Sequence, residues 1–488
     1  MSVRLFFLVW ATSCFVQAPT HAQAQGPNGQ AMPAAIAEIF TKANIPPANV
    51  GLLVQELGAA EPLLAQNIDK PFNPASVIKL VTTYAGLELL GPAYAYKTEV
   101  YTAGDLHGST LRGDLVLKGY GDPKFTFERF NQLLRQLRDR GLREIRGDLI
   151  LDAGFFEAVA YDPARFDGEP LRAYNVGPNA LMVNFKTARF FFYPSLDGKY
   201  VAISPDAKPA QLEVVNHVKL SGEYCGDWRE RIKLEVQTLS ATQLRVTFTG
   251  NYPASCGEKV WNVSVLDHAR FNGGLFASAW RELGGVWKGA VRLSGIPPGA
   301  RLIATTDSAP LAEVVRDINK YSNNVMARQV FLTLSAETLK QPGETVRSAK
   351  IVREWLAAKN IAAPELVLEN GSGLSRAERI SAQTLGSLLQ AAWKSSVMPE
   401  FVSSLPLIGV DGTMRKRAKG ESVAGNARIK GGTLNDARAI AGYVLDRNGK
   451  NWIVVMLVNH PNAGATQAAQ DALLQWVYAR PEAPVQIP

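Results

Sequence analysis

Asn73-Pro-Ala-Ser-Val-Ile-Lys79 is the clearest helix start in this chain of 488 residues. Its asparagine is suited to cap a helix, and its proline fits the first helical position, where a backbone N–H has no partner in any case. The apolar residues that follow predict a helix that continues to about Leu90. Residues three apart on a helix share a face, so the serine hydroxyl and the lysine amine are expected to meet.

Ser76 and Lys79 form a pair that can carry out nucleophilic catalysis. A serine hydroxyl is a poor nucleophile until a neighbouring base takes its proton. Lys79 can be that base when it is neutral, and apolar neighbours or a second cation would lower its pKa. Ser76 also lies in the first helical turn, where free backbone N–H groups can stabilise an oxyanion. Ser-x-x-Lys occurs once in the chain, although so short a pattern also arises by chance.

Two further short motifs contain polar residues that can serve the same site. Tyr321-Ser-Asn-Asn324 falls in the break between helices expected over about 310–320 and 322–339. A serine can be exposed there, and an N-cap is the alternative. Lys430-Gly-Gly-Thr433 precedes a hairpin and is expected at the start or edge of a strand. Its glycines allow a ligand to approach the backbone, and its lysine and threonine can bind a carboxylate, with a simple turn as the alternative.

In this order, Ser-x-x-Lys, Ser-x-Asn and Lys-x-Gly resemble the signature of penicillin-binding proteins and serine β-lactamases. The 242 residues between Lys79 and Ser322 are far more than β-lactamases have. This interval makes the chain similar to the low-molecular-mass D-Ala-D-Ala carboxypeptidases/endopeptidases of the penicillin-binding protein 4 type. Three more segments share the resemblance: Gly119-Tyr-Gly-Asp-Pro123, Asn370-Gly-Ser-Gly-Leu-Ser-Arg376 and Leu405-Pro-Leu-Ile-Gly-Val-Asp-Gly-Thr413.

The resemblance implies an α/β (α+β) fold, in which helices flank an antiparallel sheet to form a transpeptidase core with a large β-rich insertion. The pattern along the chain favours the same division. Residues 34–95 and 303–488 predict strands and helices of similar type, whereas 96–302 predict mainly short alternating strands. We therefore expect a discontinuous catalytic domain and an insertion of two subdomains. Asn448-Gly449 between two apolar runs predicts a final hairpin.

The resemblance also implies a role for each motif residue. Ser76 would attack the carbonyl of the penultimate D-Ala, or of the D-Ala in a cross-link, and Lys79 would take its proton. Ser322, assisted by Lys430, would relay a proton towards the leaving amine. Asn324 would position the base and the substrate amide. No metal or organic cofactor is implied.

The third motif departs from the family pattern Lys-Thr-Gly. Gly432 and Thr433 are the expected substrate-binding residues, and the backbone N–H groups of Ser76 and Thr433 are the expected oxyanion hole. Gly431 stands where the family usually has threonine, so a hydroxyl that helps to bind the substrate's terminal carboxylate is missing. The balance between carboxypeptidase and endopeptidase activity therefore stays open.

The N-terminus and the cysteines predict export. A basic residue, a short apolar run and a small-residue cleavage region are typical of a signal peptide over 1–24, so we expect a periplasmic protein. An uncleaved anchor and a lipoprotein at Cys14 are the alternatives. Cys225 and Cys256 then remain as an even pair, and a disulfide is expected in an oxidising compartment, with two buried thiols as the alternative.

Composition limits the partners. The formal charge of +8 suits an anionic wall polymer or a lipid surface, and the dispersed basic residues do not favour nucleic acid. No later stretch is apolar enough for a transmembrane anchor, so any wall or membrane association would be loose; a homodimer stays open. Peptidoglycan stem peptides are the expected substrates, and β-lactams the expected covalent inhibitors. A β-lactamase, an esterase of the same fold and a catalytically weak peptidoglycan-binding protein are the rival functions.

Overall fold

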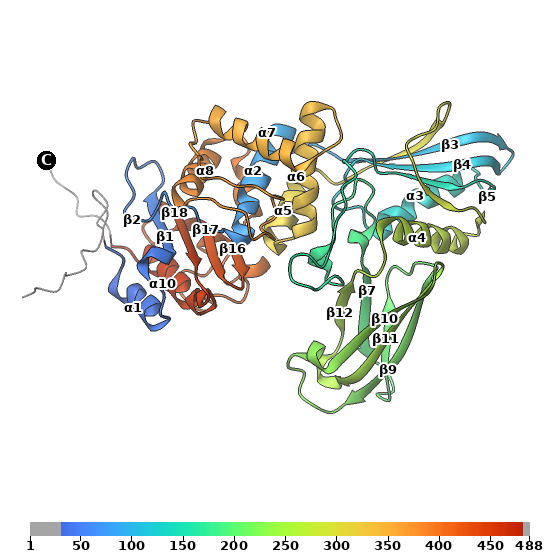
Figure 1. Cartoon of the computed structure of the whole chain (residues 1–488). Helices are drawn as coiled ribbons and strands as arrows, with labels where there is room; N and C mark the ends of the chain where they lie inside the picture. Colours follow the sequence, from blue (N-terminus) through green and yellow to red (C-terminus); the bar gives the residue numbers. More distant parts are fainter. Residues whose placement is uncertain (1–30, 482–488) are drawn as a thin grey trace, which may run out of the picture.

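The structure, a computed structural model, describes residues 31–481. The predicted signal peptide, Cys14 and the last seven residues, 482–488, lie outside the described residues. Figure 1 shows two lobes beside each other: one contains both described ends of the chain, and the other contains its middle. The middle lobe extends downwards in this view into a smaller β-rich part.

A five-stranded antiparallel sheet joins the two ends of the chain. The strand order is β16-β17-β18-β1-β2, so β16 is an edge strand. Strand β1 pairs with β18 along its whole length, with Leu53 opposite Val455. The predicted Asn-Gly turn connects β17 to β18. The strands are β1 (Val50–Glu56), β2 (Leu64–Gln66), β16 (Ala427–Leu434), β17 (Ala437–Leu445) and β18 (Asn451–Asn459).

Helices cover both faces of this sheet, because its central strands carry apolar side chains on both sides. Strand β18 is buried from Trp452 to Val458. The core on one face contains residues from α2 (Lys79–Leu90), α5 (Leu311–Tyr321), α6 (Asn324–Leu339), α7 (Thr345–Ala358), α8 (Ala382–Lys394) and α9 (Met398–Ser404), of which α8 contacts β1 and β18 directly. The other face packs against α1 (Ala34–Lys42) and α10 (Gln467–Tyr478). The predicted antiparallel sheet flanked by helices is therefore confirmed.

The middle lobe contains three further sheets. The seven-stranded sheet comprises β3 (Lys97–His107), β4 (Thr110–Gly119), β5 (Glu144–Ile145), β6 (Leu149–Asp152), β13 (Val286–Trp287), β14 (Val291–Leu293) and β15 (Arg301–Asp307). Two three-stranded sheets form the smaller part in Figure 1. Their strands are β7 (Ala188–Pro194), β8 (Val201–Pro205), β9 (Leu212–Ser221), β10 (Ile232–Ser240), β11 (Gln243–Pro253) and β12 (Lys259–Val263).

The middle lobe is less purely β than the alternating pattern predicted. Besides α3 (Phe127–Asp139) it contains α4 (His268–Glu282), in a stretch that we expected to form strands. Asp267 caps α4 by accepting the backbone N–H of Arg270 at 2.8 Å. The helix buries its aromatic residues in the core of this lobe. Two adjacent glycines and several aromatic residues, all weak helix formers, obscured the helical pattern in the sequence.

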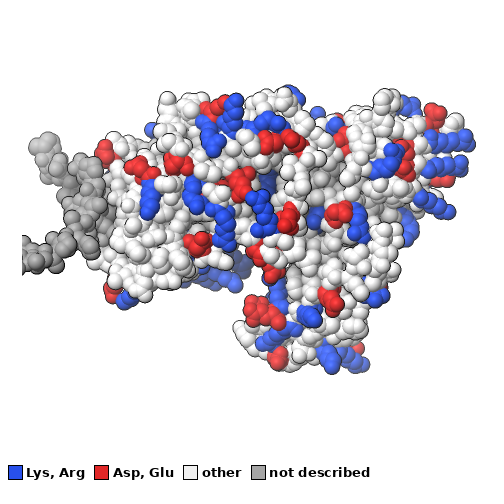
Figure 2. Space-filling model, in the orientation of Figure 1, with Lys and Arg blue, Asp and Glu red and all other residues white. Residues whose placement is uncertain are grey.

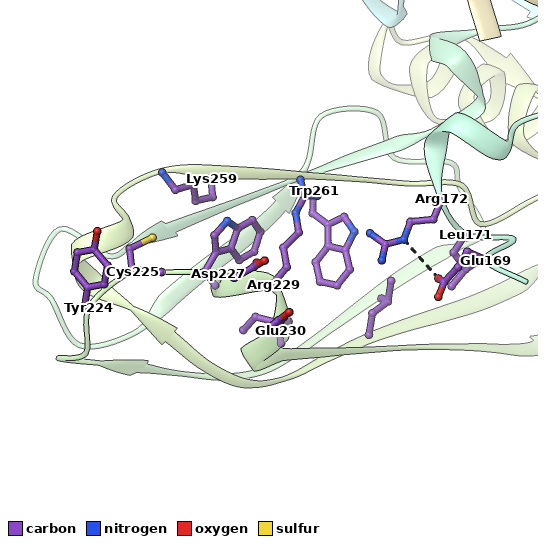
Figure 3. Close-up of a pocket in the computed structure, with 14 residues that line it drawn as sticks. Glu169, Leu171, Arg172, Tyr224, Cys225, Asp227, Arg229, Glu230, Lys259 and Trp261 are labelled. Carbon is purple, nitrogen blue, oxygen red and sulfur yellow. Dashed lines mark ion pairs between the residues drawn. The ribbon is translucent and has the colours of Figure 1, made fainter. Parts of the chain in front are cut away.

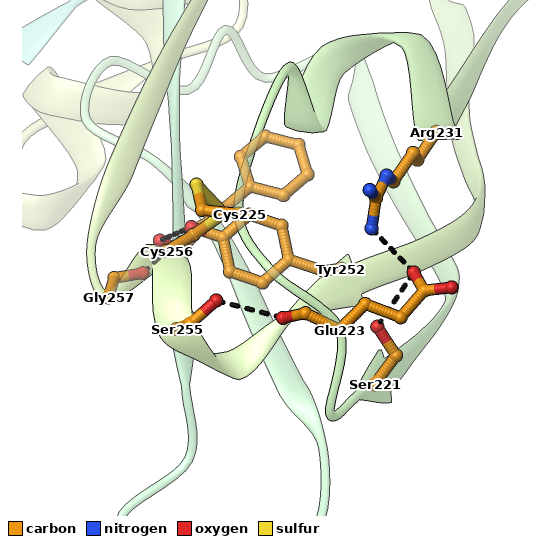
Figure 4. Close-up of a disulfide and its surroundings, with 9 residues drawn as sticks. Ser221, Glu223, Cys225, Arg231, Tyr252, Ser255, Cys256 and Gly257 are labelled. Carbon is orange, nitrogen blue, oxygen red and sulfur yellow. Dashed lines mark hydrogen bonds and ion pairs between the residues drawn. A yellow bond between two sulfur atoms is a disulfide. The ribbon is translucent and has the colours of Figure 1, made fainter.

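Cys225 and Cys256 are joined by a disulfide in the small β-rich part (Figure 4). The bond ties the loop that follows β9 to the short turn that follows β11. Two more contacts hold the same loop: the hydroxyl of Ser255 donates to the backbone carbonyl of Glu223 at 2.9 Å, and the Glu223 carboxylate pairs with Arg231 at 2.5 Å. The loop is therefore fixed at several points along its length.

Charged side chains of both signs are mixed over the face of the molecule drawn in Figure 2. Most ion pairs among the described residues are partly exposed, and such pairs contribute little to stability. Over residues 31–481, no helix has both the length and the apolar character needed to cross a membrane.

Candidate active site

The segment that carries Ser76 is not the continuous helix that we predicted. Residues Ala75–Ile78 form a 3-10 turn, η2, and α2 begins only at Lys79. The N-cap of the turn is Pro74 and not Asn73 as predicted, although Asn73 Oδ1 does accept the backbone N–H of Ala75 at 2.9 Å. The proline of this segment precedes the turn instead of occupying its first position. Ala75 has a φ of +46°, which is strained for a residue with a Cβ atom.

Lys79 is fully buried, and its amine has three polar neighbours. Nζ lies 3.0 Å from Ser76 Oγ and 2.6 Å from Asn324 Oδ1, and it also contacts the backbone carbonyl oxygen of Ser372. An amide oxygen and a backbone carbonyl oxygen can only accept hydrogen bonds, whereas a hydroxyl can also donate. A neutral lysine therefore gives its two N–H groups to these two oxygens and directs its lone pair at Ser76.

The surroundings of Lys79 favour this neutral form. Burial lowers the pKa of Lys79 well below its usual value, and the positive charge of Lys430 lowers it further. The carboxylate of Glu378 acts in the opposite direction, and Arg328 adds a smaller lowering effect. Desolvation penalises a charged amine, and a second cation nearby repels it. The lysine is thus suited to act as a general base.

Glu378 organises the loop that supplies the third neighbour of Lys79, and sequence reasoning did not identify it. Its buried carboxylate accepts the backbone N–H groups of Glu369, Asn370 and Gly371 at 3.3, 3.0 and 2.9 Å. Burial raises the pKa of Glu378. This arrangement presents the Ser372 carbonyl to the lysine. The segment 370–376 had been singled out by resemblance, but nothing local indicated a buried carboxylate beneath it.

The second motif lies where α5 meets α6. Ser322 ends α5 in a left-handed conformation, with φ +56°. The N-cap of α6 is Asn323, whose side chain accepts the backbone N–H of Met326 at 3.0 Å. The N-cap interpretation therefore applies to Asn323 and leaves the hydroxyl of Ser322 free for the site. Asn324, the first residue of α6, points its side-chain oxygen at Lys79.

Lys430 reaches the site from the edge strand β16. Its buried amine donates to Ser322 Oγ at 2.8 Å and to the backbone carbonyl of Gly431 at 2.6 Å. Burial lowers the pKa of Lys430 to about 7. All five residues predicted to be catalytic, from three separated motifs, thus lie in two neighbouring hydrogen-bonded groups: Ser76, Lys79 and Asn324 in one, and Ser322 and Lys430 in the other. The charge of Lys430 is close enough to lower the pKa of Lys79.

Gly432 allows β16 to lie directly against the Ser76 turn. A Cβ atom at this position would stand 2.6 Å from the backbone oxygen of Pro74 and 2.9 Å from the backbone nitrogen of Ser76. Only glycine fits such a close approach of two backbones. The contact places Gly432, the residue before Thr433, beside the backbone nitrogen of Ser76.

At Gly431, a threonine side chain would require the flexible end of Met414 to shift. A Cβ atom there would stand 2.7 Å from Met414 Cε. Arg438, opposite Thr433 on β17, donates from Nη1 to Thr433 Oγ1 at 2.9 Å. Among residues 31–481, Arg438 has no carboxylate within salt-bridge distance. The sequence pattern contained no signal for this unpaired arginine.

A cavity of about 500 Å³ lies between the two lobes, next to the 370–376 loop. The catalytic lobe contributes Arg328, Phe331 and Arg376, and the middle lobe contributes a segment around Tyr161. Arg328 Nη1 donates to the hydroxyl of Tyr161 at 2.6 Å and so links the two lobes. The middle lobe therefore helps to shape the surroundings of the site.

The fold and the geometry are those of a serine hydrolase, with a buried lysine 3.0 Å from the serine hydroxyl. A profile of the D-Ala-D-Ala carboxypeptidase 3 (S13) family matches residues 32–479, and the chain belongs to this family. It is accordingly a serine-type D-Ala-D-Ala carboxypeptidase. The predicted resemblance to the penicillin-binding protein 4 type is confirmed.

Individual relatives support this assignment. The chain is 28% identical over 440 residues to a D-alanyl-D-alanine carboxypeptidase of Actinomadura sp. R39, covering 87% of this chain and 80% of the relative. It is 24% identical over 427 residues to the D-alanyl-D-alanine carboxypeptidase DacB of Haemophilus influenzae, covering 85% and 86%. The crystal structure of penicillin-binding protein 4 from Haemophilus influenzae has the same fold, with a TM-score of 0.72 at 21% identity, covering 90% of this chain and 99% of that one.

Proposed function

We propose that this enzyme hydrolyses D-alanyl bonds in the stem peptides and cross-links of peptidoglycan through an acyl-enzyme on Ser76. The observation that carries this proposal is the environment of Lys79. Its amine has two neighbours that can only accept hydrogen bonds and one hydroxyl that can donate. A base that is desolvated and oriented in this way is what a serine nucleophile requires.

Acylation begins when Ser76 Oγ attacks the carbonyl carbon of the penultimate D-Ala and its proton passes to Lys79. The oxyanion of the tetrahedral intermediate accepts hydrogen bonds from the backbone N–H groups of Ser76 and Thr433. When the C–N bond breaks, the leaving amine takes a proton from Ser322, which Lys430 resupplies through their 2.8 Å hydrogen bond. Water then attacks the ester carbonyl, the C–O bond to Ser76 breaks, and one proton of the water returns to Ser76 Oγ as the shortened peptide leaves as an acid. Lys79 gives the proton that it gained to solvent and Lys430 takes one up, so both amines return to their starting states.

The terminal carboxylate of the substrate binds at Thr433, with Arg438 in the place of the missing threonine hydroxyl. A guanidinium forms stronger hydrogen bonds with a carboxylate than a neutral hydroxyl does. Arg438 already contacts the hydroxyl of Thr433, so a carboxylate at Thr433 would meet a cation that is otherwise unpaired.

Arg438→Ala is therefore expected to raise KM for a peptide ending in D-Ala-D-Ala by about tenfold or more, since hydrogen bonds to charged groups contribute about 1.5–3 kcal/mol. The acylation machinery is untouched, so kcat should change little. Steady-state kinetics with the free acid and with the same peptide as its C-terminal amide measure this effect. Arg447→Ala, in the turn beyond β17, is the matched control. An equal loss on both peptides would contradict the carboxylate role.

Several broader features belong to the same proposal. A structure of the Haemophilus protein is described as a complex with a β-lactam, and we infer that β-lactams acylate Ser76 here as well. We propose that residues 34–95 and 303–488 form the catalytic domain around the insertion 96–302, although β15 continues the sheet of the middle lobe to Asp307. We also propose export to the periplasm and contact with the wall, with a homodimer left open.

Digestion of purified muropeptides tests the proposed function. Loss of terminal D-Ala from monomers would report carboxypeptidase activity, and conversion of cross-linked dimers to monomers would report endopeptidase activity. Rapid turnover of nitrocefin without release of D-Ala would instead indicate a β-lactamase, and hydrolysis of simple acyl esters alone would indicate an esterase.

The charge of Lys430 is expected to set part of the pH dependence. Lys79 works in its neutral form, so acylation by penicillin rises as the pH passes upwards through its pKa. Lys430 is charged below about pH 7, and its charge helps to hold the pKa of Lys79 down. Lys430→Met removes that charge, so the pKa of Lys79 rises and the acid limb of the remaining acylation moves to higher pH.

The second-order rate of labelling by fluorescent penicillin, measured against pH, checks this prediction. Lys186→Met is the control, because Lys186 is also buried, with its pKa lowered to about 8, but lies in the middle lobe. An acid limb that stays in place, or that moves to lower pH, would show that Lys430 does not act on Lys79 in this way.

A further inference from the structure

A groove of about 1000 Å³ lies in the small β-rich part (Figure 3). None of its lining residues belongs to the catalytic cluster. One wall is strand β12, and the opposite wall is the short helix η5 (Trp228–Arg231) with the start of β10. In the figure, Tyr224 lies at one end of the groove, and Glu169 and Arg172 lie at the other. The groove is therefore elongated.

Aromatic rings are available inside this groove. Trp261 on β12 is only partly buried. It packs against the rings of Phe248 and Trp228, with ring centroids 6.0 and 6.1 Å apart. These contacts support the indole from the core and leave it in the lining of the groove. Tyr224 is 84% exposed, which is unusual for a large aromatic side chain.

The backbone on both sides of the exposed tyrosine is held in place. Its neighbour Cys225 forms the disulfide to Cys256, and the preceding Glu223 is fixed by Ser255 and Arg231 (Figure 4). A loop restrained at this many points loses little further conformational entropy when a ligand binds. The restraint therefore suits an aromatic contact surface for a ligand.

The charged side chains that line the groove sum to zero, whereas the whole chain has a formal net charge of +8. Three cations and three carboxylates line it: Arg172, Arg229, Lys259, Glu169, Asp227 and Glu230. Arg172 pairs with Glu169 at 3.5 Å, and Arg229 donates to the backbone carbonyl of Val260 at 3.2 Å. A polyanion would meet as many repulsive as attractive groups here. A neutral ligand with many hydroxyl or amide groups would find both donors and acceptors.

We propose that this groove binds the neutral sugar strand of the wall polymer, as a second attachment site separate from the catalytic centre. The C–H faces of sugar rings are apolar and can stack on Trp261 and Tyr224, while the charged side chains hydrogen-bond to hydroxyl and acetamido groups. This inference rests on the proposed function, since the stem peptides cleaved at Ser76 are attached to such strands. Binding there keeps the enzyme on the polymer and raises the local concentration of stem peptides.

Binding of a soluble β-1,4-linked N-acetylglucosamine hexamer to the full chain tests the site. Calorimetry should detect binding to the wild type, and Tyr224→Ala and Arg229→Ala should each weaken it by roughly tenfold, as for anchoring aromatic and arginine side chains at other interfaces. Tyr200→Ala is the matched control, because Tyr200 is 58% exposed in the same part but does not line the groove. Circular dichroism should show that all three variants are folded.

An activity assay separates this proposal from the proposed function. We expect Tyr224→Ala to hydrolyse a short D-Ala-D-Ala peptide at the wild-type rate and to release D-Ala from intact sacculi several-fold more slowly. Absence of hexamer binding, or equal binding by Tyr224→Ala and wild type, would overturn the sugar site while leaving the enzyme intact. Binding of sugar-free stem peptides that depends on Tyr224 would also overturn it, because the groove would then be a peptide site. Failure of the wild type on the short peptide would instead refute the proposed function.

Discussion

Ser76→Ala is expected to lower kcat/KM for release of D-Ala by at least about 10³-fold, because removal of the nucleophile leaves only binding and oxyanion stabilisation. The substitution removes one oxygen from a half-buried position, so the fold should be unchanged. Covalent labelling by penicillin should disappear at the same time. Muropeptide digestion and mass spectrometry of the intact chain after incubation with penicillin measure the two effects.

Ser375→Ala is a useful control for this variant. Ser375 lies in the nearby 370–376 loop, but its hydroxyl contacts Glu369 and the backbone N–H of Ala377, away from the lysine. We expect it to remain open to acylation by penicillin. A Ser76→Ala protein that still formed a stoichiometric penicillin adduct would show that another residue is the nucleophile.

Lys79→Met is expected to lower the rate of acylation by roughly 10²–10⁴-fold, the range that a positioned general base contributes. Methionine fills much of the same volume but cannot take a proton. Because burial of an amine is unfavourable, the thermal midpoint should stay the same or rise while activity falls. Stopped-flow labelling with a fluorescent penicillin and a thermal melt provide the two measurements.

Lys186→Met is the control for Lys79→Met, because it replaces a buried lysine that lies outside the proposed catalytic site. Lys186 is buried and its pKa is lowered by desolvation, so this variant should show a similar effect on stability with full activity. If Lys79→Met acylated as fast as the wild type, the general base would have to be sought elsewhere, with Lys430 as the next candidate.

Local sequence patterns predicted much of the fold. The final hairpin predicted around Asn448-Gly449 is formed by β17 and β18, because two apolar runs joined by an Asn-Gly turn specify a hairpin by themselves. Lys430, which was expected at the start or edge of a strand, instead lies in the middle of β16, and β16 is an edge strand of the sheet. In contrast, α4 was missed, since its glycines and aromatic residues favour a helix weakly and tertiary burial stabilises it.

The catalytic cluster shows the same division. The spacing of three residues was enough to predict that Ser76 and Lys79 lie close together. The order of the motifs then indicated the other three residues, Ser322, Asn324 and Lys430. The parts played by Glu378 and Arg438 could not be predicted from local sequence. Glu378 affects Lys79, which is distant in sequence, and Arg438 contacts Thr433 on a neighbouring strand. The continuous helix predicted from Asn73 is interrupted for a similar reason. The 3-10 turn that replaces its start lies in close contact with Gly432 on β16, which is distant in sequence.

The sequence by itself therefore determined which side chains are available for chemistry: it supplied the candidate nucleophile, base, relay and carboxylate-binding strand in the order of the family's motifs. Only the tertiary structure decided how these groups work together. Hydrogen-bond direction and desolvation depend on neighbours from separate elements, such as Ser372, Asn324 and Lys430 around Lys79. Charge balance in the groove around Trp261 likewise exists only once distant segments have been folded against each other.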